Sequence, residues 1–185
     1  MPREESLTDV KHVSYLLIVL PCSRCGSLSQ HYPQGIDHEL KRACEDVIAS
    51  CADTVCKPLR FWLERVAQHN ALPQHPPLAA QGWASDAAVS ALLTGFREAC
   101  LRDLRAAVAR LKLYLEEERT VAVLVKHVQE RVVDEYAEFR RVVWAEYDGP
   151  VRGEVSNEES LRALLQEACD ADSDASTPAG ASNRT

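Results

Sequence analysis

Residues 120–147, TVAVLVKHVQERVVDEYAEFRRVVWAEY, decide the fold class of this chain. Apolar side chains recur in this stretch every three or four positions, at Val121, Leu124, Val128, Val132, Tyr136, Phe139, Val143 and Tyr147. An α-helix has about 3.6 residues per turn, so this spacing places all of them on one face. The segment therefore predicts an amphipathic helix about 40 Å long, capped by Thr120, that packs sideways against other helices.

Residues 85–115 repeat the same apolar periodicity and predict a second long helix. Ser85 comes just before the periodic residues and is a preferred type of N-terminal cap. The predicted buried positions are Val89, Leu92, Phe96, Cys100, Leu104, Val108, Leu111 and Leu115. Residues 116–119, EEER, contain no apolar side chain and predict the turn between the two helices.

A third helical pattern precedes these two and runs from Asp37, a candidate cap, to about Asn70. Its apolar stripe consists of Leu40, Cys44, Val47, Cys51, Val55, Leu59, Trp62 and Val66. Pro58 has no backbone N–H, so we expect a kink where the carbonyl of Thr54 loses its donor. Several prolines follow Asn70, and residues 71–84 therefore predict a linker.

The C-terminal part of the chain predicts one short helix and a tail. Gly149 and Pro150 end the long helix. The sequence SNEE has the form of a capping box, in which Ser156 and Glu159 satisfy free backbone N–H groups. The apolar face of the short helix consists of Leu161, Leu164, Leu165 and Ala168. Residues 169–185 are small, polar and acidic, and they predict a disordered tail.

The amino-terminal segment, residues 1–35, does not continue the long-helix pattern. Residues 15–20, YLLIVL, would suit either a signal peptide or a buried amphipathic helix. Acidic residues near the start spoil the basic leader of a signal peptide, and a helical stripe favours the amphipathic helix. This stripe consists of Leu7, Val10, Val13, Leu17 and Leu20. Residues 21–36 are rich in Cys, Pro, Gly and Ser and predict an irregular segment.

Composition supports an all-α domain over residues 36–168, built as an elongated bundle of long amphipathic helices. Hydrophobic residues make up 46%, enough for a core, while 7 glycines are few for a β-sandwich or barrel with many turns. The formal net charge of −7 argues against nucleic-acid binding and against direct docking on an anionic membrane. No apolar run reaches the roughly 18 residues that a membrane-spanning helix needs.

Seven cysteines raise the question of a disulfide scaffold or a metal site. Their number is odd, their spacing is irregular and several fall on predicted apolar faces, which favours reduced thiols in a cytosolic protein. Cys22 and Cys25 have a spacing that can bind zinc or cycle as a redox dithiol. Neither a second half-site for zinc nor the strand–helix context of a redox motif accompanies them. Two unrelated loop cysteines are the simpler interpretation, and the metal or redox alternative stays open.

No residue pattern predicts a catalytic residue or a bound cofactor. Glu116, Glu117 and Glu118 could supply carboxylates, but general acid–base catalysis needs a sheltered carboxyl, and a solvated turn explains these three. His127 has no second His or Glu four residues away with which to bind a metal. Neither a GxSxG motif nor a Gly-rich phosphate loop occurs in the sequence.

Two features remain open to a binding role. One is a basic stripe made of Arg97, Arg102, Arg105, Arg110 and Lys112. Glu98 and Asp103 share its helix, which favours a mixed solvated face over a site for an acidic partner. The other is a set of aromatic residues that could be core or contact, with core as the default: Phe61, Trp62, Trp144 and Tyr147.

Several short segments resemble one known family. They are LKRACED at 40–46, QGWA at 81–84, LKLYL at 111–115, and the residues Thr120, Val123, Leu124, Lys126, Val128, Phe139, Glu146, Tyr147, Glu159, Leu161, Leu164 and Leu165. In order and approximate spacing they are similar to the carboxyl-terminal part of the third subunit of the conserved oligomeric Golgi complex. The resemblance covers about residues 36–168, and family members are several times longer than this chain.

The resemblance implies a non-catalytic subunit, or a fragment of one, of a Golgi vesicle-tethering complex. It implies a role in intra-Golgi retrograde transport and Golgi organisation, exerted through protein–protein contacts. The implied partners are the other subunits of the complex, together with SNAREs, Rab proteins and coat proteins. The implied location is the cytoplasm, peripherally on the cytosolic face of Golgi membranes. The alternatives are an unrelated all-helical adaptor or scaffold, or a metal or redox module at Cys22 and Cys25.

Overall fold

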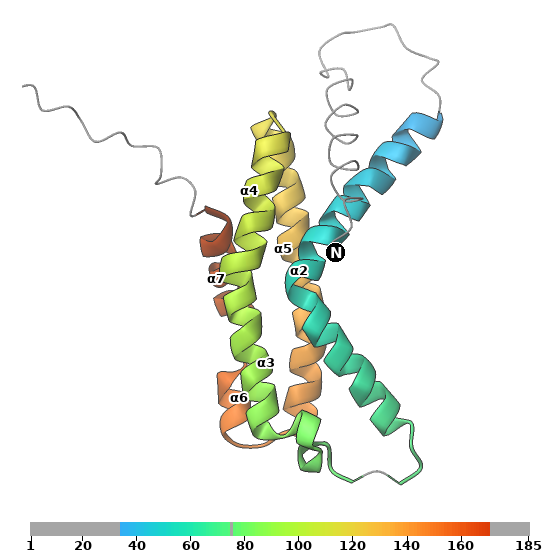
Figure 1. The fold of residues 1–185 in the computed structure, drawn as a ribbon, viewed down its shortest axis with the longest axis vertical. Coiled ribbons are helices and arrows are strands. Elements are labelled where there is room, and N and C mark those ends of the chain that lie inside the picture. Colours follow the sequence, from blue (N-terminus) through green and yellow to red (C-terminus); the bar gives the residue numbers. More distant parts are fainter. Residues whose placement is uncertain (1–33, 75, 171–185) are drawn as a thin grey trace, which may run out of the picture.

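Figure 1 shows the computed structural model of the chain, which describes residues 34–74 and 76–170. Every regular element in these residues is helical, which confirms the predicted all-α class. The elements are α2 (Gln34–Asn70), η1 (Leu78–Ala80), η2 (Gly82–Ala84), α3 (Asp86–Ala99), η3 (Cys100–Leu104), α4 (Arg105–Tyr114), α5 (Glu118–Glu146), α6 (Pro150–Glu154) and α7 (Glu158–Asp170). The predicted apolar helix within residues 1–33, the pair Cys22 and Cys25, and residues 171–185 of the predicted tail lie outside the described residues.

Three long helical segments form the body of the fold. α2 and α5 lie side by side and run in the same direction, while the segment from α3 through η3 to α4 runs in the opposite direction (Figure 1). α7 packs against η3, α5 and α4, and α6 packs against α3 and α5. The three long helices that the apolar periodicity predicts are all present.

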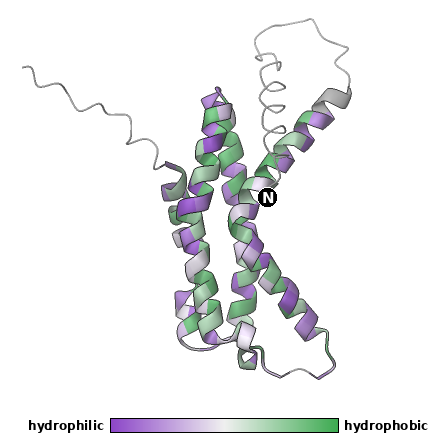
Figure 2. Cartoon of the chain, viewed as in Figure 1, coloured by the Kyte–Doolittle hydropathy of each residue, from purple (hydrophilic) through white to green (hydrophobic). Residues whose placement is uncertain are grey.

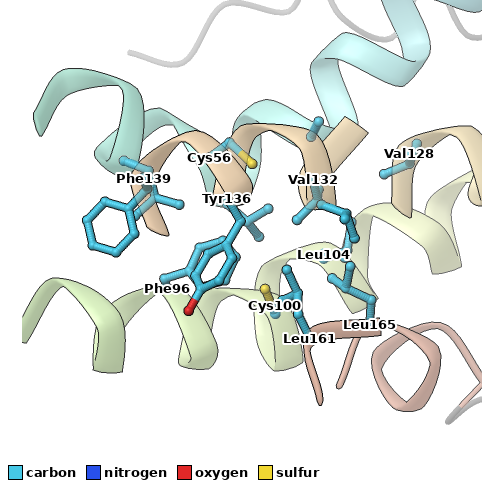
Figure 3. Packing of buried hydrophobic residues seen from close by; sticks show 14 of the residues in the cluster. Cys56, Phe96, Cys100, Leu104, Val128, Val132, Tyr136, Phe139, Leu161 and Leu165 are labelled. Atoms are coloured by element: carbon cyan, nitrogen blue, oxygen red, sulfur yellow. The ribbon is translucent and has the colours of Figure 1, made fainter. Parts of the chain in front are cut away.

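The inner face of α5 lies at the centre of the core. All eight apolar residues of the periodic pattern in residues 120–147 are buried. Figure 3 shows Val132, Tyr136 and Phe139 beside residues of other helices, among them Phe96 and Leu165. Burying one such side chain contributes about 1.5–3 kcal/mol, so this face is a main source of stability. Figure 2 shows hydrophobic and hydrophilic residues interspersed along each long helix, as amphipathic helices require.

Helix α2 continues through its internal proline. Pro58 lies inside α2, and Figure 1 shows that α2 bends in its middle, in agreement with the kink expected there. The hydroxyl of Thr54, whose carbonyl loses a donor at Pro58, donates a 2.7 Å hydrogen bond to the carbonyl oxygen of Cys51. Such back-bonding accompanies helix bending. Val55 and Leu59 stay buried on either side of the proline, so packing of the stripe offsets the lost hydrogen bond.

The helix predicted for residues 85–115 is not regular throughout, because it contains a π-helical turn, η3, over Cys100–Leu104. The buried residues Phe96, Cys100, Leu104 and Val108 are spaced by four positions each. In a regular helix a four-residue spacing drifts around the axis, because one turn holds only about 3.6 residues. A π-turn takes up one extra residue and keeps these side chains facing the core. At the start of this segment the predicted cap is confirmed, because the N–H of Ala88 donates to Oγ of Ser85 at 3.4 Å.

The cap predicted for α5 is wrong. The helix begins at Glu118 with Glu117 as its N-terminal cap, so Thr120 lies inside the first turn. The hydroxyl of Thr120 donates to Oε2 of Glu117 at 2.7 Å instead of accepting from a backbone N–H. The acidic turn is therefore shorter than predicted, because Glu118 is already helical. Carboxylates at a helix N-terminus interact favourably with its dipole, which accounts for this start.

The capping box predicted at Ser156 and Glu159 is also wrong. Oδ1 of Asn157 accepts a 2.7 Å hydrogen bond from the N–H of Ser160, so Asn157 caps α7. The N–H of Ser156 donates instead to the hydroxyl of Tyr136 at 3.0 Å, which ties this residue to α5. Helix α7 extends to Asp170, so the first two residues of the segment 169–185 are helical, and Cys169 is buried.

A sharp turn separates α5 from α6. Gly149 has φ of 78°, a left-handed conformation that favours glycine, and Pro150 opens α6. This turn brings α6 back against α3 and α5. Within residues 34–74 and 76–170, no helix combines the length and the apolar character that crossing a bilayer requires.

Candidate interaction surface

A cluster of aromatic rings joins α2, α5 and the linker that follows α2. The ring centroid of Trp62 lies 5.1 Å from that of Phe139 and 6.5 Å from that of Trp83, both in edge-to-face geometry. The hydroxyl of Tyr147 donates a 2.6 Å hydrogen bond to the carbonyl oxygen of Ala84. Burial raises the pKa of Tyr147 to about 12, so the hydroxyl remains protonated and able to donate at neutral pH. The cluster holds the end of the linker against α5.

Charged residues between α2 and α5 pair with each other. Arg60 donates to a carboxylate oxygen of Asp53 on its own helix, and its Nε lies 2.8 Å from Oε2 of Glu135 on α5. Nε of Arg131 lies 3.2 Å from Oε1 of Glu135. Both oxygens of the Glu135 carboxylate are therefore engaged by arginines. The Arg60–Glu135 pair links α2 to α5, whereas the Arg131–Glu135 pair lies within α5.

The cysteines in the described residues are free thiols, and most are deep in the interior. Burial raises the pKa of Cys51 to about 11 and that of Cys100 to about 12, and it raises the pKa of Cys56 and Cys169 above the usual range. The thiolate is the form that binds metals and attacks oxidants, and it is almost absent here. In the part of the chain that the structure describes, no cluster of His, Cys, Asp and Glu is suited to a metal ion.

The structure does not bring the candidate carboxylates and His127 together as a site. Glu116, Glu117 and Glu118 are exposed at the turn before α5. His127 is exposed on α5, and its Nδ1 lies 3.3 Å from Oε2 of Glu130. None of these groups is sheltered from water, so the arrangement gives none of them the environment of a catalytic acid or base.

The basic stripe does not form one surface. Arg97 donates to the carbonyl oxygen of Glu154, and Nζ of Lys112 donates to the carbonyl oxygen of Cys169 at 3.0 Å. These two residues therefore fasten α6 and α7 to the central helices. Nε of Arg102 lies 2.8 Å from Oδ1 of the neighbouring Asp103, so a carboxylate stands beside this arginine. The mixed-face interpretation agrees with this arrangement better than a continuous site for an acidic partner.

A groove of about 740 Å³ lies where the turn between α4 and α5 meets the C-terminal end of α7. Its apolar lining includes Leu115, Val121 and Val125, and its polar lining includes Lys126 and Asp170. Charges of both signs alternate around it, so the groove does not favour a ligand of one charge. It offers contact area for another protein rather than convergent groups for a small molecule.

The aromatic residues that the sequence leaves open between core and contact divide evenly. Trp62 and Tyr147 are buried, whereas Phe61 is 67% exposed and Trp144 is 48% exposed. The other large hydrophobic side chains exposed within the described residues are Leu72, Leu113 and Val123. Phe61 precedes Trp62 and Trp144 follows Val143, so each exposed ring is one position outside a buried stripe. That offset is compatible with a surface position but does not fix one, because Cys56 and Val133 stand at the same offset and are buried.

Trp144 is held between guanidinium groups from two helices. Cζ of Arg140 lies 5.4 Å, and Cζ of Arg152 on α6 lies 5.8 Å, from the centroid of the indole. Arg152 also donates to the carbonyl oxygen of Trp144 and lies 3.3 Å from a carboxylate oxygen of Asp148. We call this region the Trp144 surface. It consists of Ala137, Arg140, Arg141, Trp144 and Ala145 of α5 and Arg152 of α6.

A protein-family model described as the COG3 C-terminal cap domain matches residues 39–156 of the chain. The matched range includes nearly all of α2 and every element from η1 to α6. The family suggested by the short matching segments in the sequence is therefore confirmed. No curated protein and no solved structure matches the chain.

Proposed function

The chain belongs to the COG3 C-terminal cap domain family, and on this basis we propose that it is a non-catalytic subunit, or part of one, of a Golgi vesicle-tethering complex. The family match over residues 39–156 is the observation that carries this proposal. The described fold supports it. Arg60 is paired, most of the described thiols are buried and the glutamates before α5 are exposed, so the main features of the fold are packed helices and the surfaces that they present.

The proposed mechanism is contact without chemistry. A tether places weak binding surfaces at separated points on stiff helices and so holds two partners near each other. Once one surface is bound, the second binds at a high effective concentration, which multiplies the overall affinity. The parallel packing of α2 and α5, held by their buried apolar faces and linked by Arg60 and Glu135, supports the rigidity that this mechanism needs.

We propose that the other subunits of the same complex are the first partners. Contacts with SNAREs, Rab proteins and coat proteins, and a role in intra-Golgi retrograde transport, extend the same proposal. The chain would then act peripherally on the cytosolic face of Golgi membranes, bound there through other proteins. The net charge of −7 supports such indirect attachment, because an anionic membrane surface repels it.

Affinity purification tests the proposal directly. The tagged full chain, expressed in cells, should recover other subunits of the Golgi tethering complex. The matched control is Phe139→Ala, since Phe139 is fully buried and its loss should destabilise the core that holds the contact surfaces in place. Recovery of a different set of proteins by the wild-type chain, without any tether subunit, would favour an unrelated helical adaptor.

Loss of the chain gives a second, independent readout. Cells without it should show altered processing of Golgi glycans, because vesicles that return resident enzymes would no longer be captured. Re-expression of the wild-type chain should restore the glycans, and Phe139→Ala should not. Unchanged glycans in cells that lack the chain would contradict the proposed role in Golgi transport.

A further inference from the structure

The Trp144 surface has the composition of a binding hot spot. Tryptophan and arginine are the residue types over-represented where binding energy concentrates in protein interfaces. Here one indole lies between Arg140 and Arg152 at 5.4 and 5.8 Å, so contacts from α5 and α6 both hold it. A side chain that is already held in place loses little conformational entropy when a partner binds. The ring is 48% exposed, so a partner can cover the rest of it.

The shape of this surface suits a helix. Ala137, Arg141, Trp144 and Ala145 follow the spacing that places residues on one face of α5. Both alanines are exposed, and their small side chains leave room on either side of the indole. A partner helix can therefore approach α5 closely while one of its apolar side chains packs against Trp144.

The charge of the surface points to the chemistry of the partner. The whole chain carries a formal charge of −7, yet this surface contributes three arginines. Arg141 pairs with Glu138 at 2.6 Å and Arg152 pairs with Asp148, whose side chain is 96% exposed. Within the described residues, Arg140 pairs with no carboxylate. Exposed ion pairs contribute at most about 1 kcal/mol, so carboxylates of a partner can compete for Arg141 and Arg152 as well as bind Arg140.

We propose that the Trp144 surface binds an acidic amphipathic helix of another protein subunit of the tethering complex. An apolar side chain of that helix packs on the indole of Trp144, and its carboxylates pair with Arg140 and Arg152. The identity of the partner rests on the proposed function, whereas the chemistry of the surface does not. The two can therefore be tested separately.

Binding of a defined peptide tests the chemistry. The probe is a labelled synthetic helix with leucines on one face and glutamates beside them, and its counterpart carries lysines in place of the glutamates. Fluorescence anisotropy should show tighter binding of the glutamate peptide to the wild-type chain, weakened at least about tenfold by Trp144→Ala or Arg140→Glu. Phe61→Ala removes an exposed ring elsewhere on the surface and should leave binding unchanged. Equal affinity of the two peptides, or no effect of Trp144→Ala, would overturn the proposal.

Vesicles that contain phosphatidylserine provide a further comparison, because a membrane surface is also anionic. Binding of the chain to these vesicles through Trp144, without binding of the glutamate peptide, would assign the surface to lipid and overturn the proposal. Circular dichroism should show that Trp144→Ala and Arg140→Glu keep the wild-type helix content. A loss of binding then reports on the surface and not on the fold.

Recovery of the complex from cells tests the partner. Trp144→Ala should recover about tenfold less of at least one tether subunit than the wild-type chain, whereas Phe61→Ala should recover the same amount. A photo-reactive residue at position 144 should cross-link to an acidic segment of that subunit. Equal recovery of the tether subunits by Trp144→Ala and the wild-type chain would contradict this inference and leave the proposed function intact. If the wild-type chain recovers no tether subunit, the proposed function fails, and the peptide experiment still decides the chemistry of the surface.

Discussion

Trp62 and Trp144 are chemically identical side chains in two opposite settings. Trp62 is buried on α2 among the rings of Phe139, Trp83 and Tyr147. Trp144 lies on the outer face of α5, about half exposed, with guanidinium groups beside it. Burial of the Trp62 region removes apolar surface from water during folding and so stabilises the fold. In our proposal the exposed part of Trp144 is removed from water only when a partner binds.

The Trp62 cluster stabilises the fold, whereas the Trp144 surface is exposed to possible partners. Around Trp62, rings from α2, α5 and the linker contact one another, so a change there affects three segments at once. Around Trp144, the contacts come from α5 and α6 and lie at the surface. Substitutions in the first region should therefore change stability, and substitutions in the second should change binding.

The largest effect is expected at Phe139. Its ring is fully buried between Trp62 and Tyr136, so Phe139→Ala should lower the free energy of unfolding by about 3–5 kcal/mol. Urea denaturation followed by circular dichroism measures this change. The matched control, Phe61→Ala, removes the same atoms from an exposed site and should change the free energy by about 0.5 kcal/mol or less. Equal losses in the two variants would show that the buried and exposed regions are not distinct.

A smaller effect is expected at Tyr147, at the edge of the same cluster. Tyr147→Phe keeps the ring but removes the hydrogen bond to the carbonyl oxygen of Ala84, which should cost about 1–2 kcal/mol. Because this bond holds the linker, amide hydrogen exchange should accelerate most in residues 78–84. Exchange that accelerates equally in α7 would mean that the bond stabilises the whole domain and does not act on the linker alone.

The cap of α7 gives a still smaller and more local effect. Asn157→Ala should lower the free energy of unfolding by about 1 kcal/mol, because the N–H of Ser160 loses its acceptor. Ser156→Ala keeps the backbone N–H that donates to Tyr136 and removes only the 3.3 Å hydrogen bond that its Oγ accepts from Arg97, so it should cost about 0.5 kcal/mol. The reverse order in urea denaturation would restore the capping box predicted from the sequence.

Much of the fold follows from the sequence because helical periodicity is a strong local signal. The eight residues of the 120–147 stripe are all buried, and Ser85 and Pro58 act as their chemistry predicts. The misassigned cap at Ser156 has a tertiary cause, whereas the one at Thr120 is displaced by the neighbouring glutamates. Tyr136 takes the N–H of Ser156, and this contact between α5 and the start of α7 has no local signature. The four-residue spacing around η3 is visible in the sequence, but the π-turn that it accompanies depends on packing of those side chains against α2 and α7.

The candidate surface was less accessible to prediction. The sequence groups Trp144 with Trp62 as aromatic residues of uncertain role, because periodicity alone does not say which neighbour covers a residue beside the stripe. The contact with Arg152 depends on the turn at Gly149, which folds α6 back onto the end of α5. Arg140 lies one helical turn before Trp144, whereas Arg152 reaches the indole only in three dimensions. The basic stripe singled out from the sequence lies elsewhere, on α3, η3 and α4.

The effect on stability expected at Trp144 is well below that expected at Phe139, and it sharpens the comparison most. Trp144→Ala removes two cation–π contacts and the buried half of the indole, so the free energy of unfolding should fall by about 1–2 kcal/mol, well below the loss expected for Phe139→Ala. The same variant should weaken binding of the acidic helix at least about tenfold, which corresponds to about 1.4 kcal/mol. Substitution of a buried tryptophan such as Trp62 should instead lower the free energy of unfolding strongly. Urea denaturation of Trp144→Ala alongside Phe139→Ala provides the measurement. A loss of several kcal/mol would mean that the indole is needed to hold α6 against α5. The main role of Trp144 would then be structural, and its exposure would not indicate a binding surface.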